Sequence, residues 1–379
     1  MINYNFILPV WGQSYLETFL NISLPTQLAP QNIPLLASDH DLIYRIYTRP
    51  QDVPRLENSS VIARLAKQVK TEIIGTREIN FNASNHYDPF SACYRLGMQR
   101  AEQEKAAALF LTADQVWANG ALSGIIKRGD EGFRSVMISG PRINQETFIP
   151  ELIKQFAGQE VITISPREAV ALAMNHLHPW DRSLFWAADH LGRSASFMYW
   201  HVPNEGLLMR CFHLHPILVN PLNGFPRLHR TIDGSDFVRR ACPNINHLHV
   251  IEDSDEVMYF SIAPASQSAE WIDRPKQNWQ QVVFWARSMG LTKHNLFYLQ
   301  KKIRLHLGEM STHWTATESL SDRVVDPITK SLDYPLKLFY FRIMTDLRRP
   351  IGQFLRKHPF LLKVINLIRS FRRKNREWV

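Results

Sequence analysis

The sequence contains few cysteines, and the three present, Cys93, Cys211 and Cys242, lie far apart along 379 residues. Their odd number and wide spacing, with no Cys-x-x-Cys pair, argue against a disulfide framework and a cysteine-based zinc site and fit a reducing compartment. The sequence also lacks a run of about 18 apolar residues, which a membrane-spanning helix needs. Its first basic residue is Arg45 and the apolar stretch near the N-terminus is short, so a signal peptide is not expected. These absences predict a cytoplasmic location.

Three motifs that mark common enzyme families are absent as well. No GxGxxG fingerprint follows an apolar strand, no GxxxxGK followed by Ser or Thr occurs, and no GxSxG nucleophile elbow occurs. Dinucleotide dehydrogenases, P-loop enzymes and ordinary α/β-hydrolases are therefore disfavoured. A nucleotide could still bind if a metal ion or Arg and Lys side chains held its phosphates.

The formal net charge of +9 is concentrated at one end of the chain. Residues 334–379 hold 12 of the 44 Lys and Arg residues and 2 of the 35 acidic residues, which leaves 32 basic and 33 acidic residues in positions 1–333. A neutral body does not attract polyanions over its surface, so nucleic acid is not an expected partner.

The basic tail has an amphipathic pattern. In residues 360–374, apolar side chains recur at helical spacing and Lys and Arg occupy most of the other positions. This pattern predicts a helix that lies on an anionic membrane surface, where each basic residue contributes about 1 kcal/mol. The alternative is a helix that packs its apolar face on the body and leaves the basic face in water.

Apolar runs alternate with helical patterns through the first half of the chain. The runs typical of strands cover residues 6–10, 42–48, 71–74, 107–112 and 133–138, and helical spacing follows most of them. Such alternation predicts an α/β fold with a mixed, mainly parallel sheet and helices on both faces.

The second half of the chain has a different periodicity. Shorter apolar segments over 197–264 predict a mixed or antiparallel extension, and two helices separated near Met289-Gly290 are expected within 277–307. Residues 307–333 are polar and predict a loop or a short helix. We therefore divide the chain into a body, a C-terminal helical extension and a basic tail, covering 1–265, 266–333 and 334–379.

Asp114 is the first candidate for a functional side chain. It closely follows the apolar run 107–112, which is typical of a strand buried on both faces. Carboxylates at the C-terminal ends of buried parallel strands lie where α/β proteins bind their ligands. The alternative is an acid that caps a helix or lies in a loop.

The histidines are unevenly distributed, because nine of the 15 lie between His176 and His249. The tripeptide His-Leu-His occurs three times, and on a strand such a pair presents two imidazoles on one side, which suits a metal ion. His213 and His215 lie in a predicted strand, whereas His176 and His178 lie at a helix end, where positions i and i+2 diverge. A mixture of capping, core and surface roles is the alternative.

Two acidic segments offer further candidates. Asp233 and Asp236 lie in TIDGSDF, and Asp253 and Asp255 lie in VIEDSDEVMYF. Clustered carboxylates before an apolar strand can serve as a general base or as cation ligands. They can equally be turn and cap residues, because Asp-Gly and Asp-Ser are common in turns.

Three segments together resemble the GT-A type nucleotide-sugar glycosyltransferases of bacterial polysaccharide biosynthesis. They are FILPVWGQSYLETFLNISLPTQL from Phe6, IYTRPQDVPRL from Ile46 and LFLTADQVWANGALSGI from Leu109. The resemblance covers residues 1 to about 145 and implies a GT-A-like fold. It further implies that the nucleotide is bordered or contacted by Pro9, Trp11, Gly12, Thr48 and Arg49, with Asp114 as the first acid of the family's Asp-x-Asp motif.

The sequence departs from that motif, because it has Asp114-Gln115-Val116 and lacks the second acid. The divalent ion of such enzymes, Mn²⁺ or Mg²⁺, is bound less well by one carboxylate than by two. One possibility is that a histidine or acid from the second half of the chain completes a metal site, and the candidate ligands are then Asp114, His213 and His215. The other is that basic residues replace the metal.

The resemblance implies transfer of a sugar from a nucleotide-sugar donor to a lipid-linked or polysaccharide acceptor at the cytoplasmic membrane face. If the reaction inverts, a carboxylate takes the acceptor's proton, and the candidates are Asp233, Asp236, Asp253 and Asp255. Two other functions stay open. One is a metal-dependent hydrolase that uses Asp114 and the His-Leu-His pairs, and the other is a noncatalytic, nucleotide-binding scaffold at the membrane surface.

Overall fold

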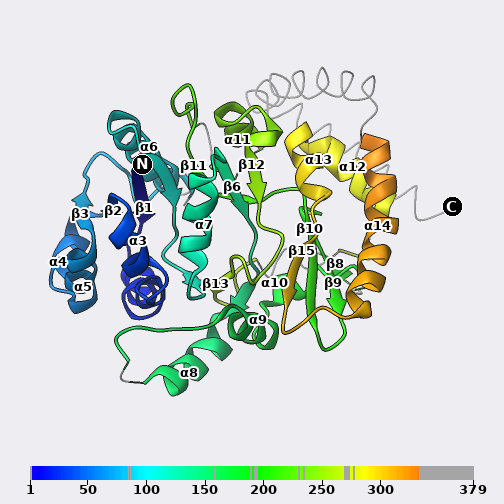
Figure 1. The fold of residues 1–379 in the computed structure, drawn as a ribbon, viewed down its shortest axis with the longest axis horizontal. Helices are drawn as coiled ribbons and strands as arrows, with labels where there is room; N and C mark the ends of the chain where they lie inside the picture. Colours follow the sequence, from blue (N-terminus) through cyan, green and yellow to red (C-terminus); the bar gives the residue numbers. More distant parts are fainter. Residues whose placement is uncertain are drawn as a thin grey trace, which may run out of the picture. The chain divides into compact units, whose positions relative to one another are not determined.

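The computed structural model describes residues 2–83, 85, 87–157, 159–187, 190–191, 195–228, 231–233, 235–268, 274–275 and 278–332 (Figure 1). The predicted amphipathic tail, 334–379, lies outside these residues. The chain forms two compact units, Met1–Gln277 with Thr292–Val325 and Asn278–Leu291 with Asp326–Val379. Every helix in the described part is too short or too polar to traverse a bilayer.

A seven-stranded sheet forms the centre of the first unit. β11 runs antiparallel to both of its neighbours, and every other adjacent pair is parallel. The predicted α/β fold with a mixed, mainly parallel sheet is therefore confirmed. In spatial order the strands are β12 (Leu248–Val250), β6 (Ser135–Ile138), β11 (His215–Val219), β4 (Ala107–Phe110), β1 (Tyr4–Pro9), β2 (Leu42–Thr48) and β3 (Lys70–Gly75).

Helices cover both faces of this sheet, as the alternation of apolar runs predicts. Successive side chains of a strand point to opposite faces, so Tyr4 and Ile7 of β1 lie on different sides. Gly129 of α7 (Ala121–Asp130) lies against the Tyr4 ring, whereas Gly97 of α6 (Tyr87–Gln103) lies so close to Ile7 that a Cβ would come within 2.5 Å of its side chain. The two helices therefore pack on opposite faces.

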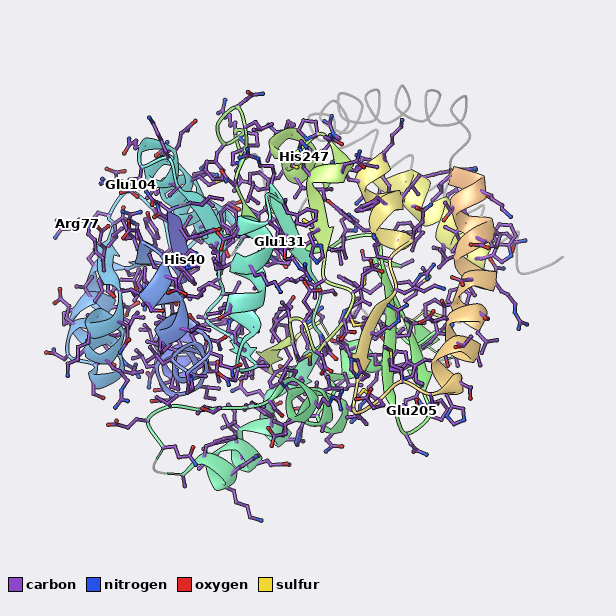
Figure 2. The ribbon with its side chains drawn as sticks, in the orientation of Figure 1. His40, Arg77, Glu104, Glu131, Glu205 and His247 are labelled. Carbon is purple, nitrogen blue, oxygen red and sulfur yellow. The ribbon has the colours of Figure 1, made fainter. Side chains whose placement is uncertain are left out.

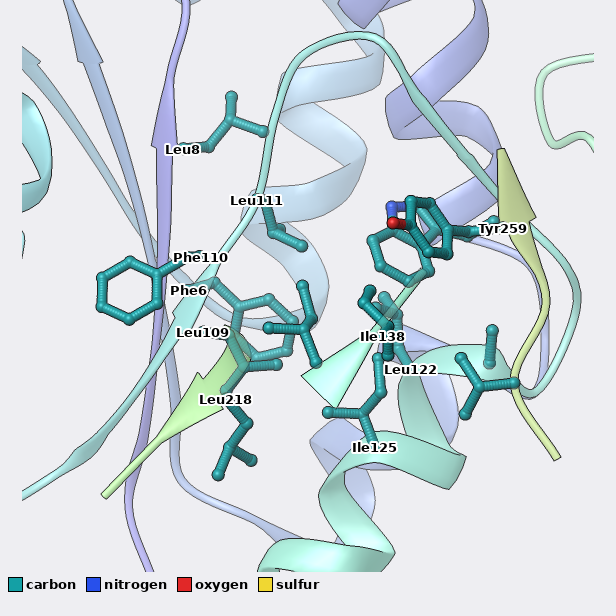
Figure 3. Packing of buried hydrophobic residues seen from close by; sticks show 14 of the residues in the cluster. Phe6, Leu8, Leu109, Phe110, Leu111, Leu122, Ile125, Ile138, Leu218 and Tyr259 are labelled. Atoms are coloured by element: carbon teal, nitrogen blue, oxygen red, sulfur yellow. The ribbon is translucent and has the colours of Figure 1, made fainter. Parts of the chain in front are cut away.

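The core on the α7 side is continuous from strand to helix. Phe6 and Leu109 are register partners on adjacent strands and are both buried. Figure 3 shows these side chains beside Leu122 and Ile125 of α7, with Phe110 pointing to the other face. On that other face, the Phe110 ring lies 5.0 Å from the ring of Tyr94 in α6. Because β4 packs against apolar side chains on both faces, its residues are all apolar and do not alternate with polar ones.

Charge is buried in one place on the α6 side of the sheet. The Arg45 side chain of β2 is fully buried and donates from both terminal nitrogens to Glu104, at 2.9 and 2.6 Å, and from Nε to Glu72 of β3 at 2.7 Å. Glu104 is labelled in Figure 2. A buried guanidinium needs such pairing, because an unpaired charge in the core is strongly destabilising.

Smaller sheets and short helices complete the first unit. The small sheets are β5 (Gln115–Trp117) with β13 (Tyr259–Ala263) and β7 (Arg142–Asn144); β15 (Ile303–His306) with β10 (Gly206–Cys211) and β9 (Phe197–Val202); and β14 (Arg274–Pro275) with β8 (His190–Leu191). The remaining helices are α1 (Gln13–Thr18), the π-helix η1 (Phe19–Ser23), α2 (Leu24–Gln27), α3 (Ile33–Asp39), η2 (Pro50–Asp52), α4 (Val53–Glu57), α5 (Ser60–Gln68), α8 (Gln145–Phe156), α9 (Pro166–Asn175), α10 (Pro179–Arg182), α11 (Ser235–Ala241), η3 (Ile245–His247) and α13 (Lys293–Leu299).

In the second unit, α12 (Trp279–Met289) begins with a capping box at Asn278 and ends at Gly290, whose φ of 65° lies in the left-handed region that favours glycine. The predicted break near Met289-Gly290 is thus confirmed. Within this unit, the Arg287 guanidinium donates to the Ser331 carbonyl at 3.0 Å.

The prediction of a loop or a short helix over 307–333 is wrong, because the 21-residue helix α14 (Thr312–Leu332) occupies most of this segment. The buried positions Trp314, Thr317, Ser321 and Val325 do recur at helical spacing. Two of the four are polar, so a pattern based on apolar residues does not detect this helix. Strand β15 also lies within the segment expected to be helical, and it pairs with β10.

Candidate functional site

The strand order reverses between β1 and β4, and this reversal locates the candidate site. From β1 the chain continues to β2 and β3 on one side and then returns to β4 on the other. In open α/β sheets, ligands bind at such a switch point, beyond the carboxyl ends of the strands. The carboxyl ends of β1, β2, β4, β6 and β12 lie along one edge, here called the carboxyl edge, and the antiparallel strand β11 begins there.

The loops after β1 and β2 are tied together by one carboxylate. Gly12, with φ 83°, donates its N–H to Asp52 Oδ2 at 3.1 Å, and Arg49 donates to the same carboxylate from Nε and a terminal nitrogen, at 2.8 and 3.1 Å. Burial alone would raise the pKa of Asp52, but these hydrogen bonds hold it below its ordinary value. The Arg49 guanidinium is thus held by Asp52.

Three other residues predicted to border the nucleotide are in the same region. Pro9 and Thr48 end β1 and β2 and are buried, and the Thr48 hydroxyl has no hydrogen-bond partner among the described residues. The Trp11 ring packs against Phe81 and Phe90, with centroid distances of 5.1 and 5.4 Å. These contacts fix the shape of the two loops, and direct contact with a nucleotide stays a prediction.

Asp114 lies at the carboxyl edge beyond β4, as predicted. Thr112 donates its hydroxyl to Asp114 Oδ1 at 2.5 Å. Burial raises the pKa of the Asp114 carboxyl, whereas the Thr112 hydrogen bond and the charges of Arg142 and His215 act in the opposite direction. Two positive groups therefore lie close enough to influence this carboxylate.

Val116 stands where the Asp-x-Asp motif has its second acid, and it belongs to the hydrophobic core. Val116 is 1% exposed in β5, so a carboxylate there would be buried without water. The intervening Gln115 is turned back, and its Oε1 accepts the Thr112 N–H at 2.9 Å. Asp114 is consequently the one acid that the motif brings to the carboxyl edge.

His215 is held between two oxygen acceptors. Its Nε2 lies 2.8 Å from the Phe110 carbonyl, and its Nδ1 lies 2.7 Å from Asp233 Oδ1. Neither acceptor carries a proton, so each ring nitrogen must donate one and the ring is an imidazolium. Burial alone would lower the pKa of His215, but the charge of Asp233 and the two hydrogen bonds raise it.

The predicted metal ligands Asp114, His213 and His215 do not converge on one ion. An imidazolium has no lone pair for a metal, which removes His215 from the set. Burial lowers the pKa of His213, and the charge of Asp233 acts on it in the opposite direction. Within the described residues, the group whose ligand atoms all lie within 4.8 Å of one another consists of Asp253, Asp255 and His306.

The His-Leu-His pairs do not converge either. His176 contacts Glu151 at 2.9 Å, and the two ring nitrogens of His178 contact the Trp180 N–H and the Pro264 carbonyl. His249 contacts Glu256 at 2.9 Å. Each pair therefore has local partners, and the arrangement that a hydrolase would need is not formed by these side chains.

Arg142 is a site residue that the sequence reasoning missed. Its guanidinium carbon lies 5.7 Å from the Trp180 ring centroid, and its Nε lies 3.8 Å from Asp181 Oδ2. Asp181 is 2% exposed, and burial raises its pKa to about 6. A basic residue directly after Gly140-Pro141, which ends a predicted parallel strand, is the signal that could have identified it.

The remaining predicted acids lie in two separate settings. Asp236 of α11 forms ion pairs with Arg239 and Arg240 one helical turn away, at 2.5 and 2.8 Å, which is a surface arrangement. Asp253 and Asp255 follow β12 and contact His306. The structure therefore brings Asp233 to the neighbourhood of Asp114 and leaves the other three acids elsewhere.

A groove of about 380 Å³ lies beside the helices that follow β1 and β7. It lies between α1–η1, which follow the Gly12 loop, and α8, which follows β7. One part of its lining is polar, with Ser14, Glu17 and Asn21, and another part is apolar, with Ile149 and Phe156. Such a lining suits a ligand that has both hydroxyl groups and an apolar surface.

Comparison with known proteins gives matches among solved structures alone, since no family model and no curated protein matches the sequence. The structure of S. aureus TarS 1–349 is 14% identical, covers 90% of this chain and 87% of that chain, and has a TM-score of 0.40. The mannosyltransferase PcManGT from Pyrobaculum calidifontis, in complex with GDP-Man and Mn²⁺, is 11% identical, with coverages of 90% and 86% and a TM-score of 0.33. These TM-scores are too low to show a shared fold, so the site is interpreted from its own contacts.

The His215–Asp233 pair should make stability depend on pH. A raised pKa in the folded state means that the stabilisation is complete below the ordinary histidine value of about 6.5 and is lost as the pH rises through the raised value. Asp233→Asn should therefore lower the free energy of unfolding by about 1 kcal/mol at about pH 6 and by less at about pH 9, measured by urea denaturation. Asp236→Asn is the matched control, and an equal loss at both pH values would contradict the imidazolium assignment.

Proposed function

We propose that the chain is a GT-A type glycosyltransferase that transfers a sugar from a nucleotide-sugar donor. The observation that carries the proposal is the pair of His215 and Asp233 held against the Phe110 carbonyl at the switch point of the sheet, where the charges of Arg142 and His215 also act on the Asp114 carboxyl. Glycosyl transfer asks for a cradle for the donor and for stabilisation of the departing diphosphate, rather than for a protein nucleophile. The sequence resemblance to GT-A enzymes supports the same function.

The donor's base and ribose would lie against the loops after β1 and β2. Pro9, Trp11, Gly12, Thr48 and Arg49 are the residues that we propose to border them. The Arg49 guanidinium supports this placement, because its side chain is 23% exposed and a ligand can reach it. The Asp52 carboxylate would keep both loops in place.

The residues at Asp114 do not fit the divalent ion that the family resemblance implies. Asp114 is the single acid of the motif, Val116 is buried in place of the second, and His215 has a proton on each ring nitrogen. We therefore propose that Arg142 and His215 neutralise the leaving diphosphate. Arg142 can donate charge-assisted hydrogen bonds to phosphate oxygens, whereas both N–H groups of His215 are already used, so His215 would act through its charge alone.

An inverting reaction would also need a carboxylate at the acceptor hydroxyl. Of the predicted base candidates, we propose Asp233, because it lies at this site and its carboxylate is half exposed, with a side-chain exposure of 51%. The acceptor, a lipid-linked or polysaccharide glycan, would occupy the groove between α1–η1 and α8. Its polar and apolar linings match the hydroxyl groups and the ring faces of a sugar chain.

Nucleotide binding tests this proposal directly. UDP-, GDP- and CMP-sugars should be screened by thermal shift in the presence of EDTA, and one of them should stabilise the full chain. Arg142→Ala should weaken the affinity for that nucleotide by at least about tenfold, or about 1.4 kcal/mol, because a phosphate contact is lost. Arg182→Ala, an exposed arginine on the neighbouring helix α10, is the control and should leave affinity unchanged.

The screen, together with a metal analysis of the purified protein and an assay of sugar transfer, gives two results that would contradict the proposal. No response to any nucleotide, together with stoichiometric zinc in the purified protein, would favour the metal-dependent hydrolase. Nucleotide binding without sugar transfer to any acceptor would favour the noncatalytic scaffold.

We also propose that the basic tail holds the enzyme at the cytoplasmic face of an anionic membrane, as a peripheral protein. Sedimentation of the full chain with anionic liposomes tests this. Binding should fall more than about tenfold when four tail residues are changed to Gln, since each basic residue contributes about 1 kcal/mol; these are Lys363, Arg369, Arg373 and Lys374. The control changes four exposed basic residues of the body to Gln, namely Lys67, Arg77, Lys105 and Lys154. An equal loss in both variants would contradict a specific role of the tail.

A further inference from the structure

A second cluster of ligand atoms lies outside the proposed donor site. Asp253 and Asp255 lie in the turn after β12, and His306 ends β15. β12 is separated from β4 by β6 and β11, so roughly 14 Å, or three strand spacings, separates the two strand ends. An ion at this cluster is therefore independent of the proposed function and of the Asp-x-Asp motif.

The imidazole of His306 points at the two carboxylates. Its Nε2 lies 2.8 Å from Asp253 Oδ1 and 3.8 Å from Asp255 Oδ2. The His306 side chain is 4% exposed, whereas the carboxylates are 39% and 40% exposed. One buried nitrogen and two half-exposed oxygens thus converge on a point that water can reach.

A contact outside the cluster determines which His306 nitrogen carries the proton. Nδ1 lies 2.7 Å from the Gly308 carbonyl, which can only accept, so Nδ1 is the donor. Nε2, which lies 2.8 Å from Asp253 Oδ1, is then the nitrogen that faces the carboxylates and that a metal ion would take in place of this contact. A histidine whose outer nitrogen donates to a backbone carbonyl is the arrangement found at metal sites.

The backbone holds this geometry in place. Ser254 is fully buried, donates its N–H to the Arg304 carbonyl at 2.9 Å and accepts the His306 N–H on its hydroxyl at 3.1 Å. The turn after β12 is thereby fixed to β15 on both sides of the cluster. Ligands held on rigid elements lose little conformational freedom when an ion binds.

Arg167 is a basic residue that contacts the cluster. Arg167 donates to Asp255 Oδ2 at 3.0 Å and to Glu309 at 2.8 Å. A carboxylate has about four lone-pair positions, so Asp255 can keep this contact and still offer an oxygen to an ion. The Arg167 guanidinium is shared between Asp255 and Glu309 and does not contact Asp253. The negative charge of Asp253 therefore stays available for a cation.

We propose that Asp253, Asp255 and His306 bind one divalent transition-metal ion, such as Mn²⁺ or Zn²⁺. An imidazole nitrogen among carboxylates favours these ions over Mg²⁺ and Ca²⁺, which take oxygen ligands. Three protein ligands leave positions for water. The ion links the turn after β12 to strand β15.

Metal binding by the full chain tests the proposal. The chelator-treated protein should be titrated with Mn²⁺, with free Mn²⁺ followed by its EPR signal, and it should bind one ion that Zn²⁺ displaces. His306→Gln and Asp253→Asn should each weaken Mn²⁺ binding by at least about tenfold. Asp255→Asn, at a half-exposed position, gives a third variant in case His306→Gln does not fold.

Matched controls separate this site from adventitious binding. His176→Gln removes another buried histidine that contacts a glutamate, and Asp236→Asn removes an exposed acid, so both should bind Mn²⁺ like the wild type. The proposal is overturned if the wild type binds neither ion, or if its affinity is unchanged in the cluster variants.

Discussion

The reversed direction of β11 is the constraint on which the candidate site depends. β11 lies between β4 and β6 and is antiparallel to both, so its first residue, His215, reaches the edge where those strands end. A parallel strand in the same position would carry His215 to the opposite edge. The hydrogen bond from His215 to the Phe110 carbonyl then joins the start of β11 to the end of β4. One strand direction thus places an imidazolium beside the acid that follows β4.

Electrostatics at this edge differ from those of a two-carboxylate metal site. Asp114 is the one acid that the motif brings there, and Arg142 and His215 act on it as positive charges. Each cation is held by its own partner, because Asp181 and Trp180 position Arg142 and Asp233 positions His215. Groups fixed before the ligand arrives stabilise developing charge without reorganising. The proposed cation at Asp253, Asp255 and His306 serves a different part of the sheet.

The sequence predicted the regular parts of the molecule well, because apolar periodicity reports burial directly. It located β2 and β4, the two-sided covering of the sheet and the position of Asp114 beyond a buried strand. The sequence-based prediction failed where the buried residues are polar, as in α14, where Thr317 and Ser321 are buried. It also missed Arg142, because the partners of that residue, Trp180 and Asp181, are distant in sequence. The spacing of His213 and His215 suggested a metal, but the protons on His215 depend on Asp233 and Phe110, which no local pattern reveals.

The central claim is that a nucleoside diphosphate binds at the carboxyl edge through hydrogen bonds from Arg142, close to the positive charge of His215. A crystal structure of the full chain with the stabilising nucleoside diphosphate, grown in EDTA, tests it most directly. The account predicts phosphate oxygens within hydrogen-bonding distance of the Arg142 guanidinium, near the His215–Asp233 pair, with the base between the loops after β1 and β2. A nucleotide bound away from the switch point of β1 and β4, or one whose phosphates contact neither cation, would contradict it.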